Sequence, residues 1–575
     1  MTPDGRSLYA ALANALVQDG PADSSEFVGL ARILDLDLAT GEPAAEFVYE
    51  VDPAAQPAQP VGAESTNALV GLLATDNNGS FLALERSCSE SGENTVRLNE
   101  ARLQGAVNVL SLDSLFWTEG DMPYVMDPGI VKHELFDFTT AISSTADLRG
   151  MALGPELPDG RRVLVVVSDD DTAQHTQFVA LAVEFHTIPA ALPDRETPFS
   201  LDEVEAPAGM LTGDSDDPAI WVHPTDPALS LVIATKKDGG LAVFDLAAQV
   251  VQAIVPETFG SVRYNNVDLV YGLPLGGEPA VVSDMLNDVI VIYQIDPETR
   301  QLTDVTGPEA GKPVFAVGDG RHNAYGLATY TSPSTDKAYV FLTQRRGNLI
   351  AQLELADDGS GRVNATPVRM LQLPTPTGDP EGSEAEGMAI DRDLGVLYVN
   401  MTRVGGLYKF MADPDAGDEP TLVHPMEADF FTPEIEGLTI YYGSGGSGYL
   451  LASNQGSSTY LVFERAGDNA YVGTFLVGNN GDVDRADETD GLDVNNTALG
   501  PNYPSGLLVV HDGANAPLYV APDDEELEND NTNFKFIPWE NVANAFSPPL
   551  LIDPAGHAVR GAQQTEPAQT EEAQS

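Results

Sequence analysis

One pattern occurs four times in this chain: Tyr325-Gly326-Leu327-Ala328, Glu386-Gly387-Met388-Ala389, Glu436-Gly437-Leu438-Thr439 and Asp490-Gly491-Leu492-Asp493. Each copy has a polar residue, a glycine, Leu or Met, and then a strand-like run of residues. The copies are about 50 to 60 residues apart, close to the length of one four-stranded blade of a β-propeller. Because repeats place equivalent residues at equivalent points around an axis, we expect the residues before each glycine to converge on one ring.

Carboxylates occupy three of these four ring positions. Carboxylates held close together repel one another unless a cation lies between them, and calcium takes six to eight oxygen ligands. The sequence therefore predicts a site for several calcium ions, against the alternative of ordinary solvated surface carboxylates. Its candidate ligands are Asp216, Asp217, Glu384, Glu386, Glu434, Glu436, Asp484 and Asp490, with an amide oxygen from Gln455. A zinc site is not expected, because the histidines lack ligand spacing.

The charge balance limits the partners of this protein. With 88 acidic and 28 basic residues, the formal net charge is −60, so nucleic acid and anionic membranes are poor partners. A saline habitat would also explain so acidic a surface. Cys88 is the one cysteine, which excludes a disulfide within the chain, and no apolar run reaches the roughly 18 residues of a membrane span.

Short strand-like runs separated by turn residues extend over most of the chain and predict an all-β fold. We expect an N-terminal β domain over 1–190, a linker over 191–213, a propeller of six blades over 214–545 and a disordered acidic tail over 546–575. Paired strands are expected at 231–235 with 241–246, 338–343 with 349–355, 396–401 with 407–410, and 449–453 with 459–464.

Weaker copies of the pattern occur in the first 190 residues, at Val70-Gly71-Leu72-Leu73 and Arg149-Gly150-Met151-Ala152. Valine and arginine replace the carboxylates. We therefore expect an incomplete propeller-like domain that lacks the acidic ring.

Basic residues are scarce, yet pairs of them occupy two predicted hairpins. These are Lys236 with Lys237, and Arg345 with Arg346. Cationic side chains beside bound calcium would suit a phosphate-bearing substrate. The alternative is that they only balance their acidic neighbours.

Several longer motifs resemble the β-propeller phytases. They are Asp-Asp-Pro-Ala-Ile-Trp (216–221), Lys-Lys-Asp-Gly-Gly-Leu-Ala-Val-Phe (236–244), Tyr-Asn-Asn-Val-Asp-Leu (264–269), Glu-Ile-Glu-Gly-Leu-Thr-Ile-Tyr-Tyr (434–442), Ala-Ser-Asn-Gln-Gly (452–456), Thr-Asp-Gly-Leu-Asp (489–493) and Asn-Phe-Lys-Phe-Ile-Pro-Trp-Glu (533–540). The resemblance covers about 205–545. Residues 148–162 resemble the "esterase-like activity of phytase" domain, of which this chain is expected to hold a truncated copy.

The resemblance implies a calcium-dependent phosphomonoester hydrolase of the 3-phytase type, releasing phosphate from phytate by attack of a calcium-activated water. It places the calcium ligands at Asp216, Glu386, Glu434, Glu436, Asp484 and Asp490, with Gln455 beside them; Asp217 stays a candidate from the acidic cluster alone. It gives phosphate binding to Lys237, Tyr325 and Arg345, and catalytic roles to Tyr325, Glu386 and Glu436. It also implies a monomeric, secreted protein, extracellular or periplasmic, although no signal peptide is visible in the N-terminal residues.

Three positions depart from the family pattern. A phosphate-clamping arginine is replaced by Met285, a Glu-Glu pair reads Met401-Thr402, and a glutamate is replaced by Arg346. If Met285 lies in the register of that clamp, its side chain should point at the substrate; otherwise it packs into the blade core. Two alternatives to a phytase remain: a calcium-loaded propeller that binds phosphorylated ligands without turnover, and a calcium-dependent esterase or lactonase.

Overall fold

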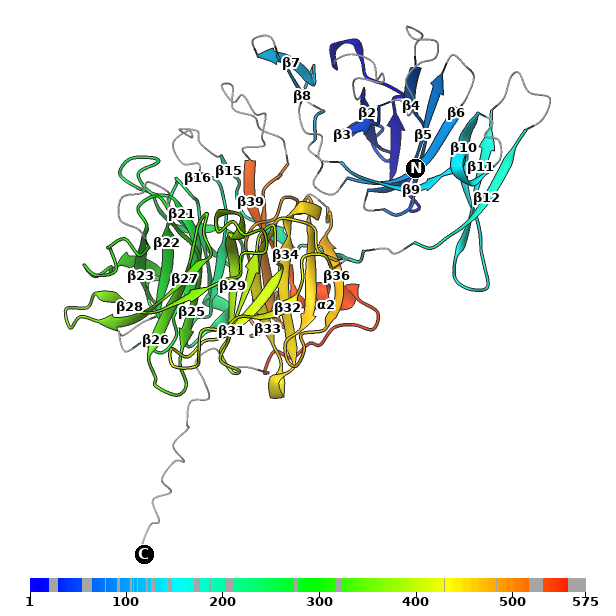
Figure 1. Cartoon of the computed structure of the whole chain (residues 1–575). Coiled ribbons are helices and arrows are strands. Elements are labelled where there is room, and N and C mark those ends of the chain that lie inside the picture. The colour runs from blue at the N-terminus through cyan, green and yellow to red at the C-terminus, as the bar shows by residue number, and fades with distance from the viewer. Residues whose placement is uncertain are drawn as a thin grey trace, which may run out of the picture. The chain divides into compact units, whose positions relative to one another are not determined.

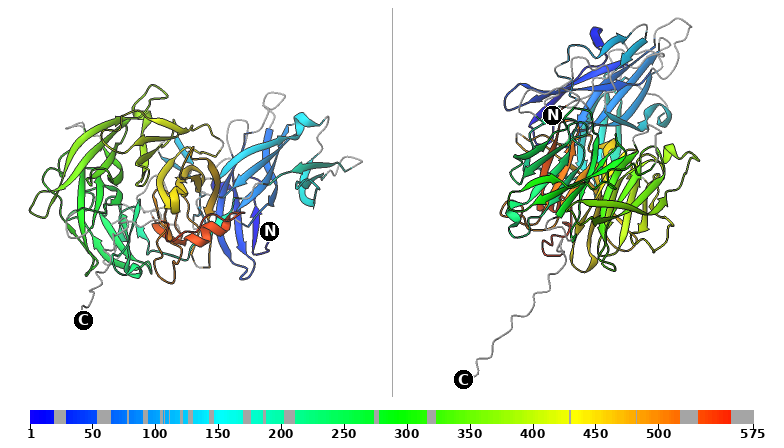
Figure 2. Two further views of the ribbon diagram at one scale, coloured as in Figure 1. Left: turned by 90° about the horizontal axis from the view of Figure 1, so that it is seen from below. Right: turned by 90° about the vertical axis from the view of Figure 1, so that its left-hand side faces the viewer.

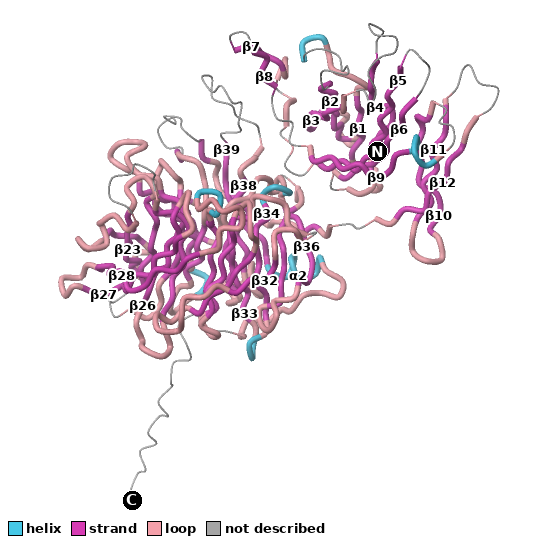
Figure 3. The backbone as a smooth tube through the Cα atoms, viewed as in Figure 1, coloured by secondary structure: helices cyan, strands magenta, loops and turns pink. Residues whose placement is uncertain are grey.

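The computed structural model describes residues 1–19, 29–53, 65–77, 79–89, 94–103, 106, 108–110, 112–119, 122–125, 130–142, 147–169, 176–185, 188–201, 211–273, 278–315, 323–428, 430–481, 483–516 and 531–556. Strands dominate them, and the α-helices are the short α1 (Phe138–Ala141) and α2 (Trp539–Ala545) (Figure 3). The chain divides into two compact units, Met1–Ala190 with Ala514–Asn531, and Ala191–Gly513 with Thr532–Ser575.

The described residues of the second unit form six β-sheets (Figure 1). Four are four-stranded: β17–β20 (Pro218–Trp221, Leu231–Thr235, Leu241–Asp245, Val250–Ile254), β21–β24 (Tyr264–Leu269, Glu278–Asp284, Val289–Asp296, Gln301–Asp304), β25–β28 (Ala324–Thr331, Ala338–Gln344, Leu349–Asp357, Val363–Gln372) and β29–β32 (Ala385–Asp391, Val396–Met401, Leu407–Met411, Thr421–His424). The fifth holds β33–β36 (Ile435–Tyr442, Gly448–Asn454, Thr459–Glu464, Tyr471–Val477) and β13 (Ala190–Ala191). The sixth holds β37–β39 (Leu492–Asn495, Leu507–Asp512, Asn531–Pro538), β14 (Arg195–Glu196), β15 (Ser200–Leu201) and β16 (Leu211–Thr212).

The first strands of these sheets contact one another in a closed cycle. β17 contacts β21, and contacts continue through β25, β29 and β33 to β37, which returns to β17. The sheets are accordingly arranged around a common axis (Figure 2). The prediction of an all-β, propeller-type fold is confirmed.

Burial explains why the middle strands read as continuous apolar runs. Every residue of β18 is buried, because neighbouring sheets cover both of its faces. The outer strand β20 mixes exposed and half-buried residues, as expected for a strand at the rim.

The segment 191–213, which composition assigns to a linker, contributes short strands to the propeller. Asp194 and Thr197 donate backbone hydrogen bonds to Phe536 and Phe534 of β39, at 2.8 and 2.9 Å. Strands from before the first sheet therefore extend the last sheet, which helps to hold the ring closed.

The start of the predicted tail is also ordered. Leu550 is buried in the core that contains Trp539, and the backbone N–H of Leu551 donates to the Tyr449 hydroxyl. Apolar side chains thus anchor 546–556; residues 557–575 lie outside the described part.

The first unit contains sheets β1–β3 (Ser7–Ala11, Gly29–Asp37, Pro43–Val51), β4-β5-β6-β9 (Ser65–Ala74, Ser80–Ser89, Asn94–Arg102, Val131–Asp137), β10–β12 (Leu148–Glu156, Arg162–Ser168, Phe178–Val183) and the pair β7–β8 (Phe116–Glu119, Met122–Val125). Its first strands also lie side by side, since β4 contacts both β1 and β10. This is the propeller-like arrangement predicted for it. Among the described residues of the chain, no helix has the length and apolar character needed to cross a bilayer.

Candidate functional site

A β-bulge lies at the same place in four sheets of the second unit, and in three of them it coincides with the repeated pattern. The pairing of the first strand with the second skips two residues in each, and these are Asn265-Asn266, Tyr325-Gly326, Glu386-Gly387 and Glu436-Gly437. A bulge re-aims a side chain that regular pleating would send to a sheet face. The fold therefore uses the same local irregularity to turn one polar residue per sheet.

The glycines in the pattern pack against the backbone of the next sheet. A Cβ atom at Gly387 would lie 1.7 Å from the Glu436 carbonyl oxygen, and one at Gly326 would lie 1.9 Å from that of Glu386. The next two glycines also contact the residue at the equivalent position of the following sheet. The Gly437 N–H donates to the Asp490 carbonyl, and the Gly491 N–H donates to the Asp216 carbonyl, both at 3.1 Å. The structure thus brings the residues before each glycine into one ring.

Lys237 supplies the positive charge within this ring. Its Nζ lies 3.7 Å from Asp216 Oδ1 and 3.6 Å from Asp490 Oδ2, and it also pairs with Asp214. Burial disfavours the ammonium form, but these three carboxylates outweigh burial and raise the pKa of Lys237 well above its usual value.

The ring carboxylates have an unmet need for positive charge. Burial raises the pKa of Asp216, Glu386 and Glu436, and the charges of neighbouring carboxylates add to this effect. Lys237 opposes it at Asp216, and a hydrogen bond with Glu436 opposes it at Glu386. Asp216 Oδ2 and Glu436 Oε2 are buried without a hydrogen-bond partner. Such oxygens are costly unless they meet a cation or water.

The described residues contain no preformed group of three or more His, Cys, Asp or Glu side chains in metal-binding geometry. The ammonium of Lys237 stands between Asp216 and Asp490 instead. The donor set itself, carboxylate oxygens with two lacking a partner, is that of a hard cation such as calcium.

Two uncharged side chains complete the inner part of the site around Glu386. Asn265 Nδ2 donates to Glu386 Oε1 at 2.6 Å, and the Tyr325 hydroxyl also bonds to Glu386. Burial, followed by the charges of Glu386 and Glu436, raises the pKa of Tyr325, so its phenol stays protonated and acts as a donor. The Arg345 guanidinium lies 5.8 Å from the centre of the Tyr325 ring.

The remaining predicted ligands have partners of their own. Gln455 Nε2 donates to Asp490 Oδ1, Glu434 pairs with Arg403, and Glu384 accepts from the Arg346 backbone N–H. Glu434 has φ of 74°, an unusual left-handed conformation for glutamate. It is the last residue of the connection between β32 and β33, two positions before Glu436. Asp484 pairs with the buried Lys535, which also contacts Glu196 and Asp512.

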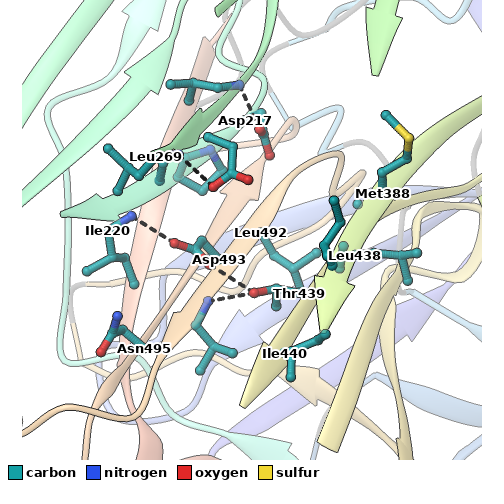
Figure 4. Close-up of a pocket in the computed structure, with 18 of the residues that line it drawn as sticks. Asp217, Ile220, Leu269, Met388, Leu438, Thr439, Ile440, Leu492, Asp493 and Asn495 are labelled. Atoms are coloured by element: carbon teal, nitrogen blue, oxygen red, sulfur yellow. Dashed lines mark hydrogen bonds between the residues drawn. The ribbon is translucent and has the colours of Figure 1, made fainter. Parts of the chain in front are cut away.

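Asp217 lines a cavity of about 100 Å³ bordered by the first strands of all six sheets. Its Oδ2 accepts from the Val267 N–H at 3.0 Å, and burial, followed by Asp493 and Asp268, raises its pKa well above the usual value. Asp493 faces the same cavity, where it accepts from the Ile220 N–H and the Thr439 hydroxyl (Figure 4). The side chain of Asp217 therefore faces this cavity, whereas that of Asp216 lies in the acidic ring beside Lys237.

Three residues near the ring were missed by the sequence analysis. Asn265 occupies the bulge position of its sheet but precedes Asn266 instead of glycine, so the pattern excludes it. His511 Nδ1 accepts from the Asp490 N–H at 3.1 Å. Burial lowers the pKa of His511, which favours its neutral imidazole. Asp214 pairs with Lys237 from a run of acidic residues in which no spacing singles it out.

Two of the positions that the sequence analysis linked to phosphate binding, Lys236 and Met285, are buried. Met285 is 2% exposed, which favours the alternative that its side chain packs into the interior. Lys236 is also buried, where its Nζ donates to Ser215 Oγ at 2.7 Å and burial lowers its pKa to about 7.

Comparison with known proteins agrees with this geometry. Residues 200–556 match the Phytase family, and residues 1–172 match the family Phytase-like, described as esterase-like activity of phytase. The chain therefore belongs to the phytase family and is an enzyme of the phytase type. A 3-phytase of Bacillus subtilis (strain 168) is 35% identical over 334 residues, which cover 57% of this chain and 80% of the relative.

Solved structures show weaker likenesses. Regucalcin, a calcium-binding protein from Agrobacterium tumefaciens, has a TM-score of 0.34 and 13% identity, covering 59% of this chain and 96% of its own. A periplasmic gluconolactonase of Pseudomonas aeruginosa has a TM-score of 0.27 and 16% identity, covering 81% and 95%. Both TM-scores are below 0.5, so these likenesses do not bear on function.

Proposed function

We propose that this enzyme is a calcium-dependent phosphomonoester hydrolase that releases phosphate from phytate, in the manner of a 3-phytase. The observation that carries the proposal is the ring of buried Asp216, Glu386 and Glu436 with half-buried Asp490, with cationic side chains beside it. Membership of the phytase family and the Bacillus 3-phytase support the substrate.

Calcium would be held mainly by Asp216, Glu386, Glu436 and Asp490, with Glu434 and Gln455 next to them. Buried oxygens without a partner on Asp216 and Glu436 support this assignment. When bound, calcium supplies Lewis-acid activation of water and neutralises phosphate charge. Lys237 now neutralises the same carboxylates, so cation binding would release its ammonium for substrate.

The side chains around the ring would bind and orient the phosphate group. Lys237 offers a point charge, Arg345 offers a planar fork of donors, and the protonated Tyr325 offers a neutral donor. Donors aimed at the equatorial phosphate oxygens stabilise the charge that gathers there in the transition state. A ring of carboxylates that would hold a cation suits attack by a water molecule which that cation activates.

Phosphate release from phytate tests the proposal, measured with calcium, with magnesium and with chelator. We expect calcium-dependent release, and a loss of at least about a hundredfold in kcat/KM for Glu436→Gln, which removes a ring charge. Glu309→Gln, at an exposed glutamate paired with Lys312, is the matched control and should keep full activity. Calcium binding without phosphate release would favour a phosphate-binding propeller, and hydrolysis of carboxylic esters or lactones alone would favour an esterase.

A further inference from the structure

A polar, buried residue lies across from the ring position in each of the six sheets of the second unit. In the second sheet, Val282 of β22 pairs with Val267, the first residue after the bulge, and Ser283 follows Val282. The equivalent residues, which we call the second polar ring, are Thr235, Ser283, Thr343, Asn400, Ser453 and His511. Each is at most 2% exposed, whereas serine, threonine and asparagine are mostly exposed in proteins.

Three hydroxyls of the second polar ring accept the N–H of the residue that follows a ring position. The bonds run from Asp217 to Thr235, from Asn266 to Ser283 and from Gly326 to Thr343, at 2.9, 3.0 and 2.8 Å. In the second and third sheets this N–H lies in the bulge, which takes it out of the strand pairing, and a buried N–H needs another acceptor. The hydroxyls therefore support the backbone that aims the ring residues.

Thr235 and Ser453 also reach the ring position of the following sheet. Thr235 Oγ1 donates to the Asn265 carbonyl and Ser453 Oγ donates to the Asp490 carbonyl, both at 2.6 Å. In the sixth sheet His511, the last member of the second polar ring, accepts the Asp490 N–H at 3.1 Å. Both the N–H and the carbonyl of Asp490 are thus held by side chains of the second polar ring.

The fourth sheet differs from this series. Its member is Asn400, whose Oδ1 and Nδ2 both lack a hydrogen-bond partner among the described residues. Glu386, the ring residue of that sheet, is held through its carboxylate instead, which accepts from Asn265 Nδ2. Support by the second polar ring therefore centres on Asp216 and Asp490, the carboxylates beside Lys237.

We propose that Thr235 and Ser453 are positioning residues of the acidic ring. Their hydroxyls hold the backbone at Asp216-Asp217 and at Asp490, so that the carboxylates of Asp216 and Asp490 converge on one cation. A ligand group whose backbone is already fixed loses less conformational freedom on binding, so the affinity for the cation depends on these bonds. That the cation is calcium and serves phosphate release rests on the proposed function; the positioning bonds do not.

Thr235→Val tests the first of these bonds in the full chain, with Thr235→Ser as the conservative variant. The matched control is Thr329→Val. Thr329 is 2% exposed, and its hydroxyl likewise donates to a carbonyl of a neighbouring sheet, that of Leu269 at 2.7 Å, four residues along β21 from Asn265. We expect Thr235→Val to raise the Kd for calcium, measured by calorimetry, about three- to tenfold, the effect of one hydrogen bond. Thr235→Ser and Thr329→Val should change this Kd less than about twofold.

Ser453→Ala and Ser230→Ala form a second matched pair. Both serines are fully buried, and Ser230 Oγ donates to the Pro227 carbonyl at 2.7 Å, at the end of β18 opposite Thr235. Without calcium, both variants should melt at similarly reduced temperatures, since each loses one buried hydrogen bond. Only Ser453→Ala should also bind calcium about three- to tenfold more weakly, which separates positioning from a purely structural role. Equal calcium affinities within either matched pair would overturn the proposal.

Amide hydrogen exchange tests the positioning bonds even if the proposed function fails. If the parent protein binds no calcium, the proposed function is wrong, and exchange at the Asp217 amide decides the role of Thr235. This amide should exchange at least about fivefold faster in Thr235→Val than in the parent protein, and at the parental rate in Thr329→Val. Equal exchange in the two variants overturns the proposal.

Discussion

At the scale of single residues, the glycine after each ring residue is required by the backbone of the next sheet. At Gly387 the nearest atom to an added Cβ is the Glu436 carbonyl oxygen, at 1.7 Å, and a backbone atom cannot turn aside as a side chain does. This contact connects the fold to the site, because it sets how closely Glu386 and Glu436 approach.

Gly387→Ala should therefore destabilise the protein and disturb the ring together. We expect a loss of about 1–3 kcal/mol in the free energy of unfolding, as for overpacked interior sites, measured by denaturant titration. Gly311→Ala is the control, because the nearest atom to its Cβ would lie 4.0 Å away. Calcium affinity should fall for the first variant only; equal behaviour of the two variants would contradict the close contact described here.

Met285→Arg tests whether a position at which the family resemblance implies a phosphate clamp faces the substrate. Because Met285 is 2% exposed, an arginine there would bury a charge or displace the strand end, and we expect a melting temperature lower by several degrees with no gain on phytate. Met285→Leu keeps the volume and should stay close to the parent protein. A stable Met285→Arg protein with raised kcat/KM would show that the side chain reaches the substrate after all.

Single-residue prediction succeeded where a repeat fixed the position. Glu386, Glu436 and Asp490 share a glycine signature, and the structure places them in one ring. Asn265 holds the same bulge position without a glycine and carries no such signal. In the sequence, Asp484 and Asp217 cannot be told apart from their acidic neighbours. In the structure Asp484 pairs with Lys535, and Asp217 lines an interior cavity. Both contacts depend on residues far away in the sequence.

At the scale of strands and sheets, the expected hairpins agree closely with the structure. The run at 231–235 corresponds to β18, which is almost continuously apolar because both of its faces are covered. The run at 349–355 corresponds to most of β27. The bulges were not predicted, since a skipped register leaves no mark in composition. The two-residue strands β13 to β16 are too short to show a period of two.

Those short strands make a prediction about where the propeller begins. A chain of residues 189–556 keeps β14 and its bonds to β39, whereas one of residues 214–556, starting at the boundary suggested by composition, leaves the β39 edge unpaired. We expect the shorter chain to be less stable by at least about 2 kcal/mol, since several backbone hydrogen bonds are lost. Thermal melts in calcium compare the two chains, and equal melting temperatures would show that these strands add nothing.

At the scale of the whole molecule, the two units share a similar arrangement of sheets, but the acidic ring lies in the second unit. In the first unit, β4 and β10 also skip register at the weak copies of the pattern, and a Cβ at Gly71 would lie 2.7 Å from the Arg149 carbonyl oxygen. The residues at these positions are Val70 and Arg149, and Arg149 pairs with Asp147. Similar backbone geometry thus carries carboxylates in the second unit only.

Calcium removal should therefore destabilise the second unit specifically. Because the net charge is −60, any added cation stabilises the protein by screening the repulsion between its carboxylates. At equal ionic strength, magnesium and calcium screen this repulsion equally. Site binding adds about 2.7 kcal/mol at a hundredfold excess over Kd, which corresponds to roughly 3 to 10 °C in melting temperature for a domain of this size.

Differential scanning calorimetry of the full chain can separate the two effects, with calcium, magnesium or chelator at matched ionic strength. We expect chelator to lower the transition of the second unit and calcium to restore it beyond magnesium, because magnesium demands a regular octahedral site. Glu386→Gln with Glu436→Gln should abolish the difference between the two ions while retaining the general salt effect, since the variant removes the charges that converge on one point. If magnesium stabilises the parent protein as strongly as calcium does, the acidic ring acts only through screening, and the calcium site proposed at Asp216, Glu386, Glu436 and Asp490 is wrong.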